Sequence, residues 1–165
     1  MISKKAPYFK GLFFGGEKVD IVETEKIESI ILKAKVCRLG MVDGNQPYVI
    51  PMSFGYRENT LYFHTGKKGR KMAILKKNNR VCFEMEVDLE IVPADNPCKW
   101  NMCYKSVVGF GRAVFLDEPV EKRKALDVIV KHYGGTVTAY DEKRVNGLAI
   151  IKVAIDSVKG KESKV

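Results

Sequence analysis

The clearest pattern along the chain is the alternation of apolar and polar side chains in residues 80–88 (RVCFEMEVD). Val81, Phe83, Met85 and Val87 fall on one face, and small or charged side chains fall on the other. A period of two residues is typical of an antiparallel strand with one buried face and one exposed face. The pattern therefore predicts a strand over Arg80–Asp88.

Shorter runs of β-forming residues, bounded by turn residues, predict five more strands. They are Cys37–Val42, Pro47–Tyr56, Thr60–His64, Lys105–Leu116 and Leu148–Ile155. Pro51 cannot donate a ladder hydrogen bond, so the second of these is expected at a sheet edge or at a bulge. Gly109 and Gly111 share one face of the long 105–116 strand, where they either admit a flat partner or mark a bend.

Three segments have the apolar spacing or the residue composition of helices. They are Glu23–Lys35 with Thr24 as its cap, Arg70–Lys77, and Pro119–Tyr133 with Asp117 as its cap. The N-terminal arm and residues 90–104 are expected to be irregular, and the lysine-rich tail after Ile155 is expected to be frayed. His132, late in its helix, is interpreted as a partner of the helix dipole.

Strands in adjacent hairpins, with few helices between them, favour a small antiparallel barrel over a doubly wound sheet. The chain is mainly β, and its 165 residues, 45% of them hydrophobic, fit one domain with a core over residues 25–155. Neither GxGxxG nor GxxxxGK[ST] occurs. No apolar run reaches the roughly 20 residues that cross a bilayer, and no secretory signal is evident, so a cytoplasmic protein without a membrane partner is expected.

The four cysteines, Cys37, Cys82, Cys98 and Cys103, form no CxxC pair. Their spacing does not favour a zinc or iron-sulfur site, and no metal is predicted. The net charge of +9 admits anionic partners of several kinds. Nucleic acid is not favoured, because the cations are not interleaved with the aromatic side chains that single-strand binders use.

The densest group of cations lies in the segment YFHTGKKGRKMAIL, residues 62–75. Here a predicted strand meets a predicted helix, and the free N–H groups and the dipole of a helix N-terminus favour a phosphate. Lys67, Lys68, Arg70 and Lys71 add full charges. The segment predicts an anion site, although such a turn can also be merely solvated.

The chain resembles the pyridoxamine 5'-phosphate oxidase-like flavoproteins, and among them the nitroimidazole-resistance branch, over about residues 25–155. Two segments carry the resemblance: PYVIPMSFGYRENTLYFHTGKKGRKMAILKKNNRVCFEMEVD (residues 47–88) and KSVVGFGRAVFL (residues 105–116). The resemblance implies a split β-barrel homodimer that binds FMN in clefts at the subunit interface. The C-terminal arginine and histidine segment of the true pyridoxamine 5'-phosphate oxidases is not matched, so that activity is not expected.

Matching positions assign site residues to three groups. The resemblance places Val49, Ile50, Pro51, Met52 and Ser53 along the flavin ring, His64, Thr65, Gly69, Arg70 and Lys71 around the ribityl phosphate, and Trp100, Asn101, Ser106 and Gly109 where the partner subunit closes the cleft. In that branch the histidine at the strand end is proposed to act near the flavin, and His64 stands at that position. The alternative is that His64 binds the cofactor and takes no part in proton transfer.

The leading hypothesis is an FMN-dependent, nitroreductase-like oxidoreductase that reduces a small electrophilic acceptor with an unidentified electron donor. The alternative is a flavin- or haem-binding carrier, store or sensor without turnover.

Overall fold

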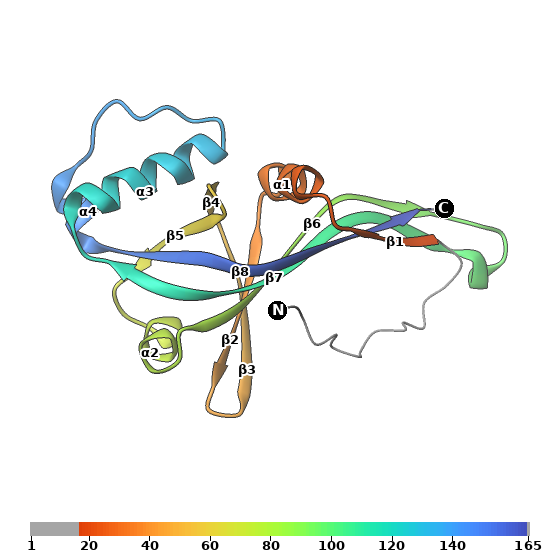
Figure 1. The fold of residues 1–165 in the computed structure, drawn as a ribbon, viewed down its shortest axis with the longest axis horizontal. Helices are drawn as coiled ribbons and strands as arrows, with labels where there is room; N and C mark the ends of the chain where they lie inside the picture. The colour runs from red at the N-terminus through yellow and green to blue at the C-terminus, as the bar shows by residue number, and fades with distance from the viewer. Residues whose placement is uncertain (1–16, 165) are drawn as a thin grey trace, which may run out of the picture.

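The two longest strands, β7 (Asn101–Leu116) and β8 (Leu148–Lys164), lie side by side at the centre of an eight-stranded antiparallel sheet in the computed structural model (Figure 1). The structure describes residues 17–164. The other strands are β1 (Glu17–Ile21), β2 (Cys37–Asp43), β3 (Gln46–Met52), β4 (Gly55–Arg57), β5 (Thr60–Gly66) and β6 (Arg80–Val92). Their order is β3-β2-β6-β7-β8-β5-β4, with β1 paired to β8.

Helices cover the sheet rather than alternate with its strands (Figure 1). They are α1 (Thr24–Lys33), α2 (Arg70–Lys77), α3 (Pro119–His132) and α4 (Glu142–Gly147), with a short 3-10 turn at Pro97–Lys99. The predicted caps were wrong: Glu23 and Glu118 precede α1 and α3, and neither side chain makes a capping hydrogen bond. His132 Nε2 lies 2.8 Å from the Ala34 carbonyl oxygen, and burial lowers the pKa of His132.

The predicted strand over residues 47–56 is two strands, because the chain leaves one edge of the sheet and joins the other. β3 and β4 are the two ends of the strand order, yet only Ser53 and Phe54 separate them. Three peptide steps span at most about 11 Å, so the sheet must curl until its edges meet at this point. The result is a barrel that is closed at the link and split beyond it. The edge position expected for Pro51 in β3 is confirmed.

Contacts with α3 hold the two strands apart. A Cβ atom on Gly55 would lie 2.6 Å from the Ile129 backbone nitrogen, so α3 packs directly on the first residue of β4. The Phe54 N–H donates to the Tyr133 hydroxyl (3.0 Å), and that hydroxyl donates to the Lys35 carbonyl (2.8 Å). The Phe54 amide is thus satisfied without a strand partner.

We expect Tyr133→Phe to lower the free energy of unfolding by about 1 to 3 kcal/mol, because the Phe54 N–H and the Lys35 carbonyl both lose their partner. Urea denaturation followed by circular dichroism measures the change. Tyr62→Phe is the control, since the Tyr62 hydroxyl makes no hydrogen bond among the described residues. An equal effect of the two substitutions would contradict this account.

Three predictions about the chain ends and the irregular segments were wrong. The tail is not frayed: β8 continues to Lys164 between β7 and β1, and Ser163 in this part is only 3% exposed. Residues 90–104 are largely ordered as the end of a hairpin in which Glu90 pairs with Cys103 and Val92 with Asn101. The N-terminal arm contributes β1, and α4 was not foreseen. Residues 1–16 of the arm lie outside the described residues.

Gly109 and Gly111 are explained by packing within the chain. A Cβ atom on Gly109 would lie 2.2 Å from the ring of Phe83, which is fully buried. A Cβ atom on Gly111 would lie 2.4 Å from the Ala154 carbonyl oxygen, and the pairing of β7 with β8 shifts between Phe110 and Gly111. The bend considered for these glycines is therefore present, as a β-bulge.

No helix among residues 17–164 is long and apolar enough to cross a membrane. Cys37 is buried, burial raises the pKa of its thiol, and all four cysteines are free. The described residues contain no group of three or more metal-ligating side chains.

Candidate functional site

The split places two unpaired strand edges opposite each other. β5 pairs with β8 along its whole length, but with β4 only over Thr60–Tyr62. If the pairing of β4 with β5 continued in the same register beyond Gly55, Ser53 would pair with His64 and Met52 with Thr65. Instead β3 turns away to pair with β2, so backbone groups on both edges have no strand partner. The predicted ring segment and the predicted phosphate segment thus border the same split, which we define as residues 49–53 and 63–66.

The basic turn begins where the β5 edge of the split ends. Gly66 closes β5, and Gly69 precedes α2 with a φ of 115°, a conformation that favours glycine. The Ala73 N–H bonds the Gly69 carbonyl, so the N–H groups of the first turn before it point out of the helix N-terminus. The predicted strand-to-helix junction is confirmed, and its cations stand beside the split.

Arg70 is held in a fixed direction by the β2–β3 hairpin. Its Nε lies 3.3 Å from an Asp43 carboxylate oxygen, and its guanidinium carbon lies 4.7 Å from the centre of the Tyr48 ring. Asp43 and Tyr48 were not recognised as site residues from the sequence. The sequence signal that pointed to them was the Asp43-Gly44 turn, because it places the end of the β2–β3 hairpin near the segment that follows β5.

The side chains of the two segments differ in exposure. His64 and Pro51 are exposed, Thr65 is half-buried, and Met52 is only 8% exposed. Met52 therefore belongs to the core, whereas the exposed residues are accessible to a ligand. His64 pairs with Ile150 of β8, and its imidazole makes no hydrogen bond or ion pair with another described residue.

The outer face of the sheet beside the split carries exposed apolar side chains. Val49 is 61% exposed and Phe110 is 55% exposed, and both lie in one cross-strand row through Gly40 and Cys82. Val108, in the next row, is also exposed. We call Val49, Val108 and Phe110 the outer apolar patch. Ser106 lies further along the same face of β7 and is half-buried.

A charged cluster adjoins this patch in the row of Val108. Arg38 of β2 places a guanidinium nitrogen 3.2 Å from a Glu84 oxygen and 2.7 Å from a Glu86 oxygen, both of β6. Burial, and then the hydrogen bond and the charge of Glu86, raise the pKa of Glu84 to about 7, and Arg38 opposes this shift only in part. Glu84 therefore keeps its proton to a higher pH than an exposed glutamate does.

This shift predicts a pH dependence of stability. Because the pKa of Glu84 is raised from 4.5 to about 7 on folding, the folded state binds more protons in that window, and stability falls as pH rises through it. Glu84→Gln should remove this slope and leave the variant more stable at pH 8 by about 1 kcal/mol or less, since the partly exposed site is screened by solvent. Urea denaturation from pH 4.5 to pH 8 measures the difference, with exposed Glu90→Gln as control. Parallel stability curves for wild type and Glu84→Gln would refute the shift.

Trp100 and Asn101 lie far from the split within one chain. Leu116, at the other end of β7, pairs with Ile150, which in turn pairs with His64. A strand of 16 residues is about 50 Å long, so Asn101 and His64 cannot share a site in the same chain. Pro51, on the other side of the split, lies in the row of Val108, seven residues along β7 from Asn101. Gly109 faces Phe83 in the core. The structure therefore brings together two of the three predicted groups and divides the third: Trp100 and Asn101 lie at the far end of the hairpin, whereas Ser106 and Gly109 lie in the middle of β7.

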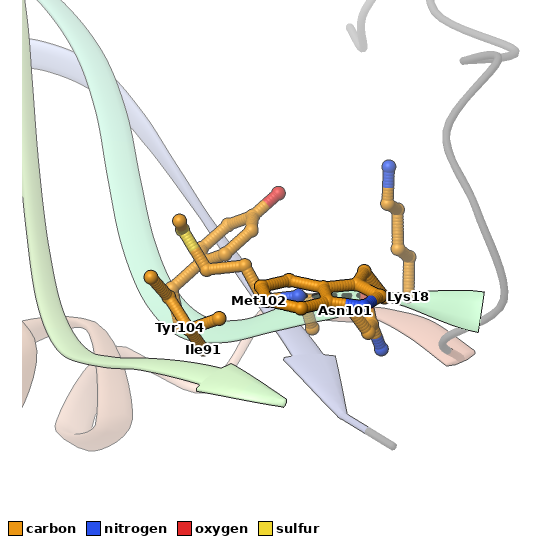
Figure 2. A pocket seen from close by; sticks show the side chains of 7 residues that line it. Lys18, Ile91, Asn101, Met102 and Tyr104 are labelled. Atoms are coloured by element: carbon orange, nitrogen blue, oxygen red, sulfur yellow. Dashed lines mark hydrogen bonds between the residues drawn. The ribbon is translucent and has the colours of Figure 1, made fainter. Parts of the chain in front are cut away.

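The far end of the hairpin has a cavity of its own, of about 460 Å³ (Figure 2). Its walls are mostly apolar and come from the β6–β7 hairpin and the ends of β1 and β8. The lining residues are Lys18, Ile91, Trp100, Asn101, Met102, Tyr104 and Ser163. Asn101 Oδ1 accepts from the Met102 N–H, but the buried Nδ2 has no hydrogen-bond partner among the described residues.

Comparison with known proteins gives a consistent family assignment. The family model described as pyridoxamine 5'-phosphate oxidase matches residues 23–162. A solved structure of a candidate 5-nitroimidazole antibiotic resistance protein from Bacteroides thetaiotaomicron has 34% sequence identity and a TM-score of 0.81, covering 97% of this chain and 96% of that chain. No match was found among curated proteins.

More distant structures share the fold. An FAD and haem binding protein from Mycobacterium smegmatis has 17% identity and a TM-score of 0.80, covering 88% of this chain and 74% of that chain. An FAD-binding protein from Mesorhizobium loti has 21% identity and a TM-score of 0.65, covering 88% of this chain and 97% of that chain. With the split sheet and the family match over nearly its whole length, the chain belongs to the pyridoxamine 5'-phosphate oxidase-like split-barrel family and is similar to a protein of its nitroimidazole-resistance branch.

Proposed function

We propose that the protein is an FMN-dependent oxidoreductase of the nitroreductase type, acting on a small electrophilic acceptor. The observation that carries the proposal is the split itself: two unpaired strand edges run to a turn with four cations and a free helix N-terminus. The unpaired N–H and C=O groups suit the polar edge of a flavin ring, and the turn suits a phosphate dianion. The flavin-binding proteins among the structural relatives support the same cofactor class.

The chain's own residues have defined roles in this proposal. Arg70, oriented by Asp43 and Tyr48, binds the phosphate with Lys71 and with the N–H groups of the first turn of α2. Val49 and Pro51 supply an exposed apolar wall on β3. His64 stands at the β5 edge, within the split, where it can hold the cofactor or move a proton. Bound flavin supplies the hydride and electron chemistry, and few catalytic side chains are needed.

We further propose a homodimer, with the cofactor at the subunit interface. The outer apolar patch lies beside Pro51 on the edge strand, and burying such side chains against a second copy is favourable. Within one chain the hairpin end with Trp100 and Asn101 lies seven residues of β7 from the row of Pro51 and almost the whole strand from the row of His64. It projects from the barrel (Figure 1) and can reach the split of a partner. Size-exclusion chromatography with light scattering tests this part. A monomer would remove it.

The test of the cofactor is the absorption spectrum of freshly purified protein, followed by release of the ligand by heat and its identification by mass. Flavin absorption bands and the mass of FMN are expected. Protein that is colourless and also takes up no added FMN would overturn the proposal.

A second candidate is a flavin- or haem-binding carrier, store or sensor without turnover. The favouring observation is the fold similarity to the FAD and haem binding protein from Mycobacterium smegmatis, together with the exposed imidazole of His64. Steady-state assays with nicotinamide donors and a nitro or quinone acceptor separate the two candidates. Bound flavin that no donor reduces would favour the carrier, and multiple turnovers would exclude it.

A further inference from the structure

Lys122 is a buried cation without a counter-charge. It lies in the first turns of α3 and is only 6% exposed, and its ammonium donates to the Leu148 carbonyl oxygen at 3.2 Å. No carboxylate among the described residues is within ion-pair distance of it. Lysine is rarely buried so fully unless it is paired, because a charge in a low dielectric is costly. A counter-anion next to the ammonium would offset this cost.

A cavity of about 330 Å³ lies against Lys122, between α2, the end of β7 and the start of β8. The charged side chains that line the cavity have a net positive charge, because Lys67, Lys76 and Lys122 outnumber the single carboxylate of Asp117. The remaining walls are apolar and comprise Met72, Phe115, Leu116, Leu148, Ala149 and Ile150. A few polar groups set in an apolar cavity of this size are typical of a site for a small organic ligand.

This cavity shares Lys67 with the basic turn but lies on another face of α2 from Arg70. Arg70 is held on the hairpin side of α2 by Asp43 and Tyr48. Met72 and Lys76, which line the cavity, follow Arg70 by two and six residues and so lie about 200° and 240° around the helix from it. The two sites thus use opposite faces of α2.

We propose that this cavity binds a small organic carboxylate whose charge neutralises the buried ammonium of Lys122. Its apolar body packs on Phe115 and Leu116, and Lys67 and Lys76 attract the anion. The inference concerns a site other than the split and does not depend on the cofactor. Ile150 lines the cavity and pairs with His64, so an occupant is one strand away from the split.

Benzoate is the probe, and benzamide is its neutral counterpart of nearly the same shape. Isothermal titration calorimetry should show benzoate binding roughly 10- to 100-fold more tightly than benzamide, the range expected for hydrogen bonds to a charged group. Lys122→Met keeps the apolar stem and should remove this preference. Lys124→Met, on an exposed position of the same helix, should keep it. Circular dichroism verifies that both variants fold.

Backbone amide NMR shifts locate the occupant, with the largest changes expected at residues 115–117, 122 and 148–150. The titration is repeated on the protein with and without bound flavin, so that loss of the cofactor and loss of this site are separate results. Absence of benzoate binding, equal affinity for benzamide, unchanged binding by Lys122→Met, or displacement of flavin by benzoate would each overturn the proposal.

Discussion

Replacing Arg70 and Lys71 together by alanine is expected to weaken FMN binding by about 3 to 6 kcal/mol, since hydrogen bonds to charged groups contribute roughly 1.5 to 3 kcal/mol each. Arg70 is preoriented by Asp43 and Tyr48, so little side-chain entropy is lost when it binds a phosphate. Lys71 follows it in the first turn of α2, beside the free N–H groups. Quenching of flavin fluorescence during titration of the apoprotein measures the affinity.

The matched control is Lys76→Ala with Lys77→Ala. This pair removes the same charge from the opposite end of α2, where no cofactor contact is proposed. If affinity depended only on the overall positive charge, both double variants would lose it equally. Flavin retention by the Arg70 and Lys71 variant equal to that of the control would place the phosphate elsewhere.

Local patterns in the sequence were enough to predict β6 as far as Asp88 and the junction between β5 and α2. The alternation over Val81 to Val87 gave β6, and the glycines at 66 and 69 gave the junction between β5 and α2. These signals are local because each depends on side chains only a few residues apart. The ligand role of residues 49–53 was assigned only through family resemblance, because nothing in these residues states which strand edge they will face.

The elements that the sequence did not reveal depend on pairing between distant segments. The end of β8 reads SVKGKESK and lacks an apolar face, yet Ser163 is buried because β1 and β7 cover it on either side. Gly160 lies close to Ile21 for the same reason, with a Cβ atom there meeting Ile21 at 2.9 Å. The extension of the β6–β7 hairpin beyond Asp88 was likewise hidden, because the register shifts between Val87 and Glu90 and breaks the alternation.

The separation of the third predicted group from the split also has a physical origin. Family resemblance assigns residues by position along the chain and does not say which subunit supplies them. Only the register, in which His64 pairs with Ile150 and Ile150 with Leu116, shows that Asn101 is almost a full strand length from the row of His64. A site that combines Trp100 and Asn101 with His64 therefore needs a second copy of the chain, which is the reasoning behind the proposed homodimer.

Gly55→Ala is expected to destabilise the fold by about 3 kcal/mol, the upper part of the usual range for overpacking. The added Cβ would lie 2.6 Å from the nitrogen and 2.7 Å from the Cα of Ile129, and backbone atoms of a helix cannot move aside as the tip of a side chain can. Either α3 lifts from β4 or β4 shifts toward β3. Urea denaturation measures the stability, and Gly147→Ala, whose Cβ would meet nothing within 4 Å, is the control.

The consequence for the split distinguishes this substitution from ordinary overpacking. The Tyr133 hydroxyl that satisfies the Phe54 amide lies just after α3, so displacement of the helix should also weaken that bond. We therefore expect Gly55→Ala and Tyr133→Phe to be non-additive, with the double variant less destabilised than the sum of the two single variants. Strict additivity would show that the helix packing and the tyrosine hold the strands apart independently.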